Sequence, residues 1–194
     1  MTSNLNGKAI IPGHRNKIIN AASFCIRGKG ICGCSMVDIA TYSQMSVGQI
    51  YRCFESKMEI AKEALKDNFG KQIQLLTLIY TQPDPIDYIL SSNMVKNKNS
   101  LVQPVFDLKL IFRTESMFYP ELSGLQYEYE QKLIKKHLSL IQSGTLFSHD
   151  YNVEMIPEII DFLITETTLM RNRQKFTNKN ISVIYKTLIN SLKI

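Results

Sequence analysis

Apolar residues recur along most of this chain at intervals of three and four positions, which is the spacing of one face of an α-helix. After residue 71 the chain shows neither the alternation of apolar and polar residues nor the Asn-Gly or Asp-Gly turns that indicate β-hairpins. The pattern therefore predicts an all-α protein of about nine helices. They are expected near residues 15–27, 36–42, 47–54, 57–81, 84–96, 101–117, 120–143, 153–172 and 178–193.

Small hydroxyl residues stand at the expected starts of three helices. Ser35, Ser46 and Ser56 are typical N-caps, because a serine oxygen accepts a hydrogen bond from a free backbone N–H of the first turn. The glycines at 28, 30 and 33 are expected to end the first helix, and the prolines at 83 and 85 to end the fourth. Pro157 predicts that the eighth helix starts late or is kinked, since its ring opposes the carbonyl four residues earlier.

The positive charge of the chain is concentrated near its start. The 194 residues include 23 lysines and arginines against 17 acidic residues, which gives a net charge of +6 and a pI near 9.1. The first 60 residues hold seven of the basic residues against three acidic ones, a net of +4 that leaves +2 for the other 134. We therefore expect two domains, residues 1–60 and 61–194, with an anionic partner for the first.

The sequence contains neither a segment that predicts a membrane-spanning helix nor one that predicts a signal peptide. The longest dense apolar patch, residues 75–80, is far shorter than the roughly 18 residues that a membrane-spanning helix needs. The first twelve residues lack the apolar segment of a signal peptide. The sequence thus predicts a cytoplasmic protein without a membrane partner.

All four cysteines lie within the first 53 residues, whereas a disulfide framework is more typically spread over a secreted chain. Reduced thiols are the expectation, with a metal site and a redox role as the alternatives. Cys32 and Cys34 are closer together than zinc ligand pairs usually are, and Cys25 and Cys53 fall in expected helix cores. No metal site is therefore predicted.

The residues that an enzyme would need are not apparent in the sequence. We find no nucleophile with its base and no metal-binding set. The glycines around Lys29 form a stretch too short for a phosphate-binding loop, and no strand precedes it. We expect neither an enzyme nor a cofactor.

The expected second and third helices are short and joined by a tight turn, with a supporting helix before them, in the basic part of the chain. This arrangement is typical of a helix-turn-helix DNA-binding unit. The third helix is expected to expose compact residues, as entry into a major groove about 12 Å wide requires. These exposed residues are Val47, Gly48, Gln49 and Arg52.

Residues 18–60 resemble the N-terminal signature of the TetR-type bacterial repressors. The matching landmarks stand at the family's separations: Ala21-Ala22, Gly30, Ser35, Asp38-Ile39-Ala40, Ser46, Gly48, Ile50-Tyr51, Phe54 and Ser56-Lys57. The resemblance covers about a quarter of the chain, and the rest agrees in length and helical character. It implies an N-terminal three-helix DNA-binding domain and a C-terminal helical domain for effector binding and dimerisation.

The resemblance also implies specific DNA contacts. Phosphate contacts are expected from Ser35, Tyr51 and Lys57, with the Ser46 hydroxyl also near the backbone. Base-edge or groove contacts are expected from Val37, Val47, Gly48 and Gln49, and either kind from Arg52. The amide of Gln49 is suited to a bidentate pair with adenine. One departure lies in the turn, where Gln44 occupies a position that commonly adopts positive φ, and there a side chain adds strain.

For the C-terminal helices the resemblance implies a homodimer that binds a palindromic operator in double-stranded DNA. The residues expected at the dimer interface are Ile160, Leu163, Thr167, Ile184 and Leu188. Their apolar stripes suit a four-helix bundle formed with the symmetry mate. The alternative is that these stripes are buried within a single subunit.

The resemblance further implies a pocket for a small, largely apolar effector that releases a repressor from its operator. The residues expected to line it are Asn93, Phe106, Arg113, Met117, Tyr127, Phe162, Thr165 and Glu166. His137 is expected at the surface. The alternative function keeps the DNA-binding module but gives the C-terminal domain a protein-interaction or architectural role without an effector.

Overall fold

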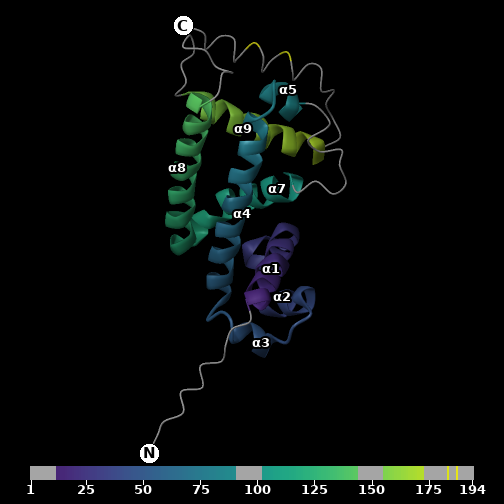
Figure 1. Cartoon of the computed structure of the whole chain (residues 1–194). Coiled ribbons are helices and arrows are strands. Elements are labelled where there is room, and N and C mark those ends of the chain that lie inside the picture. Colours follow the sequence, from purple (N-terminus) through teal and green to yellow (C-terminus); the bar gives the residue numbers. More distant parts are fainter. Residues whose placement is uncertain (1–11, 91–101, 144–154, 173–182, 184–186, 188–194) are drawn as a thin grey trace, which may run out of the picture. The chain divides into compact units, whose positions relative to one another are not determined.

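The computed structural model describes residues 12–90, 102–143 and 155–172, together with 183 and 187. Every regular element in these ranges is a helix, which confirms the all-α prediction for this part of the chain (Figure 1). None of the helices within these ranges combines the length and the apolar character needed to cross a membrane.

The chain divides into two compact units, Met1–Asp67 and Asn68–Ile194. Unit 1 contains α1 (Pro12–Gly33), α2 (Met36–Ser43), α3 (Val47–Tyr51) and the first part of α4 (Lys57–Tyr80). Unit 2 contains the remainder of α4 with α5 (Pro85–Leu90), α7 (Val102–Glu115), the 3-10 helix η1 (Ser116–Phe118), α8 (Pro120–Ser143) and α9 (Ile156–Asn172). The boundary between the units thus falls within α4.

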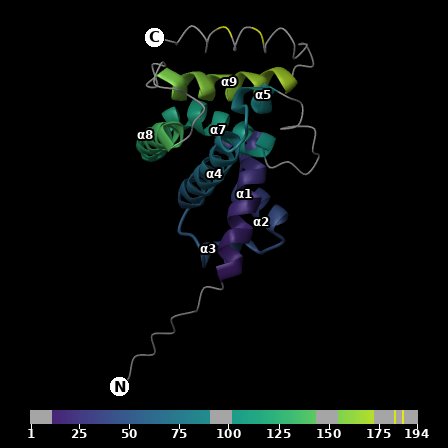
Figure 2. The ribbon, with the colours of Figure 1, turned by 45° about the horizontal axis from the view of Figure 1, so that its top comes forward.

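Unit 1 is built around the apolar face of α1, which lies beside α2 (Figure 2). The buried side chains come from all four helices and from the segment between α3 and α4, and they include Ile18, Ala22, Cys25, Ile39, Ile50, Phe54 and Ile60. Arg15 extends this packing, because its guanidinium lies 4.0 Å from the centre of the Phe54 ring and 3.5 Å from the Glu59 carboxylate. These contacts fix α1 against the start of α4.

The first helix is longer at both ends than the sequence predicts. It begins at Pro12 and continues through Gly28, and it is interrupted at Gly30, one of the three glycines expected to end it, before a second helical stretch that ends at Gly33. Only Gly30 departs from helical geometry, with φ 75° and ψ 173°, a conformation that glycine adopts without steric cost. Ile31 and Cys34 are buried beyond this kink, and their burial explains why the chain stays in contact with the core there.

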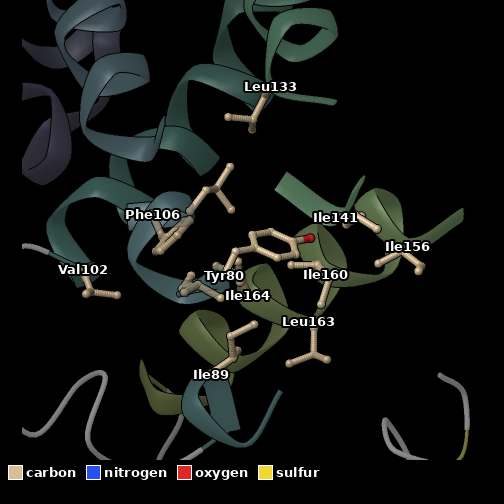
Figure 3. Packing of buried hydrophobic residues seen from close by; sticks show 12 residues of the cluster. Tyr80, Ile89, Val102, Phe106, Leu133, Ile141, Ile156, Ile160, Leu163 and Ile164 are labelled. Carbon is tan, nitrogen blue, oxygen red and sulfur yellow. The ribbon is translucent and has the colours of Figure 1, made fainter. Parts of the chain in front are cut away.

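Unit 2 has its own apolar core, drawn from α4, α5, α7, α8 and α9. Its buried members are Leu76, Ile79, Tyr80, Ile89, Val102, Phe106, Leu133, Ile141, Ile156, Ile160, Leu163 and Ile164. Figure 3 shows the Tyr80 ring in the middle of this cluster, near Phe106 and Ile160. The end of α4 is therefore anchored in the core of unit 2.

The last described helix, α9, starts three residues later than expected, at Ile156, and Pro157 therefore lies in its first turn. A proline is tolerated there because the N–H that it lacks would have no partner inside the helix. Of the expected helix over residues 178–193, the structure describes residues 183 and 187, and both are helical.

Two residues expected at a dimer interface are instead part of the core of the protomer. Ile160 and Leu163 have no exposed surface and pack against α4, α5 and α7 side chains of the same chain. Their placement favours burial within one subunit, the alternative given above. Ile184 and Leu188 lie outside the described residues, as does the side chain of Thr167.

Candidate functional site

The helix-turn-helix is present, with α2 and α3 joined by a short turn at residues 44–46. Gln44 caps α2 in the left-handed conformation, with φ 53° and ψ 40°, and its N–H donates to Thr41 O at 3.2 Å. It is the one non-glycine residue with positive φ in the described chain. The positive φ expected at this position is confirmed, and an L-residue in this conformation is less stable there than glycine would be.

Both helices of the motif begin with reciprocal hydrogen bonds between the N-cap residue and the residue three positions on. Ser46 Oγ accepts from Gln49 N–H at 3.2 Å, and Gln49 Oε1 accepts from Ser46 N–H at 2.8 Å. Ser35 and Asp38 form the same capping box at the start of α2. These bonds define the start of a helix as short as α3, which would be marginal alone.

The outer face of α3 is formed by small and polar side chains. Ile50 is fully buried and holds the helix against unit 1, while Gly48, Gln49 and Arg52 are exposed and Val47 is partly exposed. A Cβ added at Gly48 would meet no atom within 4 Å. The surface around Gly48 is thus open enough for another molecule to approach the backbone closely.

Two exposed apolar side chains flank this face. Val37 on α2 is 67% exposed and Tyr51 at the end of α3 is 54% exposed. Both side chains are therefore accessible on the surface of the motif.

The remaining predicted contact residues are held by bonds within unit 1. The Lys57 ammonium donates to the carbonyls of Ile31 at 3.1 Å and Cys32 at 3.4 Å, where a cation is favoured at the end of α1. Ser35 Oγ donates to Asp38 Oδ2 at 2.6 Å, and Lys29 pairs with the same carboxylate at 2.5 Å. The hydrogen bonds from Lys29 and Ser35 hold the pKa of Asp38 well below its usual range.

The described part of unit 2 contains a cavity of about 400 Å³ between α7, α8 and α9. Its lining residues are Lys109, Arg113, Glu130, Gln131, Leu133, Ile134, His137, Pro157, Glu158, Asp161, Phe162, Thr165 and Glu166. The volume suits a small organic molecule.

Four of the eight residues expected at an effector pocket line this cavity: Arg113, Phe162, Thr165 and Glu166. Phe106 lies in the apolar core instead. Met117 and Tyr127 are 70% and 65% exposed and are not among the lining residues. Asn93 lies outside the described residues.

The expectation that His137 lies at the surface is wrong. Its side chain is only 1% exposed, and its Nδ1 lies 3.1 Å from the hydroxyl of Tyr80, the last residue of α4. Burial lowers the pKa of His137 to about 4, so the imidazole is neutral at pH 7. The positions of Leu133 and Ile141, four residues to either side, place the histidine on the buried face of α8.

Salt bridges connect the three helices around the cavity. Lys109, which is itself buried, pairs with Asp161, and the Arg113 guanidinium lies 3.3 Å from the same carboxylate. Arg113 also reaches Glu130 at 3.5 Å. The two cations therefore link α7 to both α8 and α9.

The cysteines are free thiols, with Cys25 and Cys34 buried. Burial raises the pKa of the Cys34 thiol, so this group is protonated at neutral pH. Among the described residues, no three or more His, Cys, Asp or Glu side chains are grouped so that they could hold a metal ion.

No protein-family model and no curated protein matches this sequence. Solved structures do match it over nearly the whole chain. A TetR-family transcriptional regulator from Cytophaga hutchinsonii is 20% identical with a TM-score of 0.71, covering 95% of this chain and 98% of its own. A TetR transcription regulator from Haloarcula marismortui is 13% identical with a TM-score of 0.68, covering 95% and 100%.

This chain has the TetR fold. A third protein with the fold, from Saccharomonospora viridis, is described as a transcriptional regulator in complex with choline. It is 18% identical with a TM-score of 0.70, and the match covers 93% of this chain and 97% of that one.

On this TetR fold, nine of the thirteen residues that line the cavity were not predicted from the sequence, among them Lys109 and His137. Both had a usable signal in the sequence. Lys109 lies three and four positions from Phe106, Val105 and Phe112, which are buried on α7, and the helical spacing therefore directs it inward. Residue type suggested the surface for both, but their positions on the helix place them inside.

Proposed function

We propose that this protein is a TetR-family transcriptional regulator that binds operator DNA through α3. The observation that carries the proposal is the helix-turn-helix with its open outer face, where Gly48, Gln49 and Arg52 are exposed around a helix held by Ile50. The net charge of +4 in the first 60 residues supplies the attraction to phosphates.

Each exposed residue of the motif has a proposed role. Tyr51 with Ser35, Ser46 and Lys57 contacts phosphates, and Arg52 serves either phosphates or bases. Val37, Val47 and Gly48 lie against base edges in the major groove. The Gln49 amide forms hydrogen bonds to a base. When DNA is present, Gln49 Oε1 therefore gives up the hydrogen bond that it accepts from Ser46 N–H.

The protein acts as a homodimer on a palindromic operator, because one recognition helix holds only one half-site. Two copies related by a twofold axis place their recognition helices in successive major grooves. The resemblance of residues 18–60 to the TetR family supports this arrangement, with the C-terminal unit forming the interface.

A small-molecule effector regulates operator binding, and the protein acts as a repressor that the effector releases. The cavity in unit 2 supports this role, and a solved structure of the same fold is described in complex with choline. The cavity residue His137 contacts Tyr80 at the end of α4, the helix that begins in unit 1. Because the lining includes several charged side chains, it suits a polar effector better than the largely apolar one expected from sequence.

The proposal is tested by enlarging Gly48 without disturbing the fold. Gly48→Ala and Gly48→Leu place a side chain in open space on the outer face of α3. The matched controls are Gly28→Ala and Gly28→Leu, because Gly28 is also exposed, helical and free of neighbours within 4 Å of an added Cβ. Both alanine variants should be as stable as wild type or more stable by about 0.5–1 kcal/mol.

Operator affinity separates the two positions. Fluorescence anisotropy with a selected operator should show at least about a tenfold loss for Gly48→Leu and wild-type affinity for both Gly28 variants, since only the former sits where the backbone approaches base edges. Wild-type affinity of Gly48→Leu would show that α3 does not enter the groove.

A further inference from the structure

The cavity of unit 2 is acidic although the chain as a whole is basic. Its lining contains two cations, Lys109 and Arg113, and four carboxylates, which gives a formal charge of −2 against +6 for the whole chain. The two cations are already paired with Asp161 and Glu130. The charge that remains for a ligand is therefore negative.

The two unpaired carboxylates lie on one face of α9. Glu158, Phe162 and Glu166 are spaced four residues apart, so the phenyl ring stands between the two carboxylates along the helix. Neither glutamate has an ion-pair partner among the described residues. An aromatic ring flanked by carboxylates is a suitable surface for an organic cation, because both the ring face and the carboxylates attract positive charge.

A second unsatisfied group lies on the α8 side of the cavity. His137 lines the cavity and is buried, and its Nε2 has no hydrogen-bond partner within the described structure. When the Tyr80 hydroxyl donates to Nδ1, the neutral imidazole carries its proton on Nε2. A buried donor without an acceptor is costly, and an acceptor on a ligand would satisfy it.

We propose that the cavity binds a small organic cation that also carries a hydrogen-bond acceptor, with the cationic group at Glu158 and Glu166 and the acceptor at His137. Binding of this molecule does not depend on the proposed function. Only its role as the effector rests on that function. Anionic molecules are disfavoured because Lys109 and Arg113 are engaged by carboxylates, and an anion would have to displace them.

Isothermal titration calorimetry on the full-length protein without DNA tests the charge preference. The probes are choline, acetylcholine and benzyltrimethylammonium, each compared with its neutral carba analogue, in which carbon replaces the quaternary nitrogen. The pairs have the same shape, so any difference reports charge. We expect at least one cation to bind about tenfold or more tightly than its analogue.

The double variant Glu158→Gln with Glu166→Gln should reduce this preference about tenfold while leaving the affinity of the carba analogue unchanged. The matched control is Glu121→Gln with Glu128→Gln, which removes two negative charges from α8 outside the cavity lining. Equal losses in both double variants would overturn the proposed cation position, because they would reflect net charge alone.

The acceptor is tested by comparing acetylcholine with pentyltrimethylammonium, which lacks the ester. Wild type should prefer acetylcholine, and His137→Phe, which keeps a ring of similar size, should abolish that preference. The proposal is overturned if no cation binds more tightly than its carba analogue, or if an anion of similar size binds more tightly than every cation. Because DNA is absent from these titrations, neither result depends on whether the protein binds an operator.

Discussion

Burial of His137 makes the stability of the protein depend on pH in a defined window. Its pKa is about 4 in the folded protein, where burial disfavours the imidazolium, and 6.5 in an unfolded chain. Above pH 6.5 the imidazole is neutral in both states. Between pH 6.5 and pH 4 the unfolded state binds the proton and the folded state does not, so stability is lost as the pH falls.

The size of the effect follows from the two pKa values. Lowering the pH from about 8 to about 5 should reduce the free energy of unfolding by about 2 kcal/mol through this one group. Asp161 and Lys109 are the charged groups that act on it, and they oppose each other. Urea titrations at half-unit pH intervals measure the loss as a change in the unfolding midpoint at constant slope.

His137→Gln removes the titrating group and should flatten this part of the pH profile, whatever its effect on absolute stability. The comparison is therefore between slopes and does not require the variant to be as stable as wild type. Parallel profiles for wild type and His137→Gln between pH 6.5 and pH 5 would refute the reasoning, because His137 would then titrate alike in the folded and unfolded chain.

Three further predictions test individual positions. Gln44→Gly should raise stability by about 0.5–1 kcal/mol in thermal unfolding, because relief of the left-handed strain exceeds the entropic cost of glycine. Lys57→Ala should lower the slope of log K against log salt for operator binding by about one unit per protomer, and an unchanged slope would exclude a phosphate contact. Asp161→Asn should cost about 3 kcal/mol by leaving the buried Lys109 ammonium unpaired, and Lys109→Met in the same chain should recover most of that loss. A double variant no more stable than Asp161→Asn would show that the charge is not the cause.

The helix-turn-helix unit was predictable because its local signals agree with its packing. Ser35 and Ser46 cap the helices that the sequence assigns to them. The positive φ of Gln44 was also predictable, because this residue occupies a turn position that commonly adopts positive φ in the TetR-type sequences. The continuation of α1 through Gly28 was not predictable from the sequence, because the burial of Ile31 and Cys34 outweighs the low helix propensity of glycine.

The cavity was predicted less well, because residue type is a poor guide to which side of a helix faces a void. Phe106 and Phe162 are both bulky and apolar, yet the first is in the core and the second lines the cavity. Lys109 and His137 are polar, and both are buried where salt bridges or a tyrosine hydroxyl compensate them. Such compensation depends on residues distant in sequence, which spacing along one helix does not show.

The most direct test of the DNA-binding account is selection of bound sequences from a random duplex pool with the full-length protein. We predict enrichment of an inverted repeat whose half-site centres lie about 34–36 Å apart or a multiple of that distance, bound at least about a thousandfold more tightly than random DNA. Gly48→Leu should enrich no such repeat. Failure of the wild-type protein to enrich any sequence, with equal affinity for all duplexes, would contradict the account.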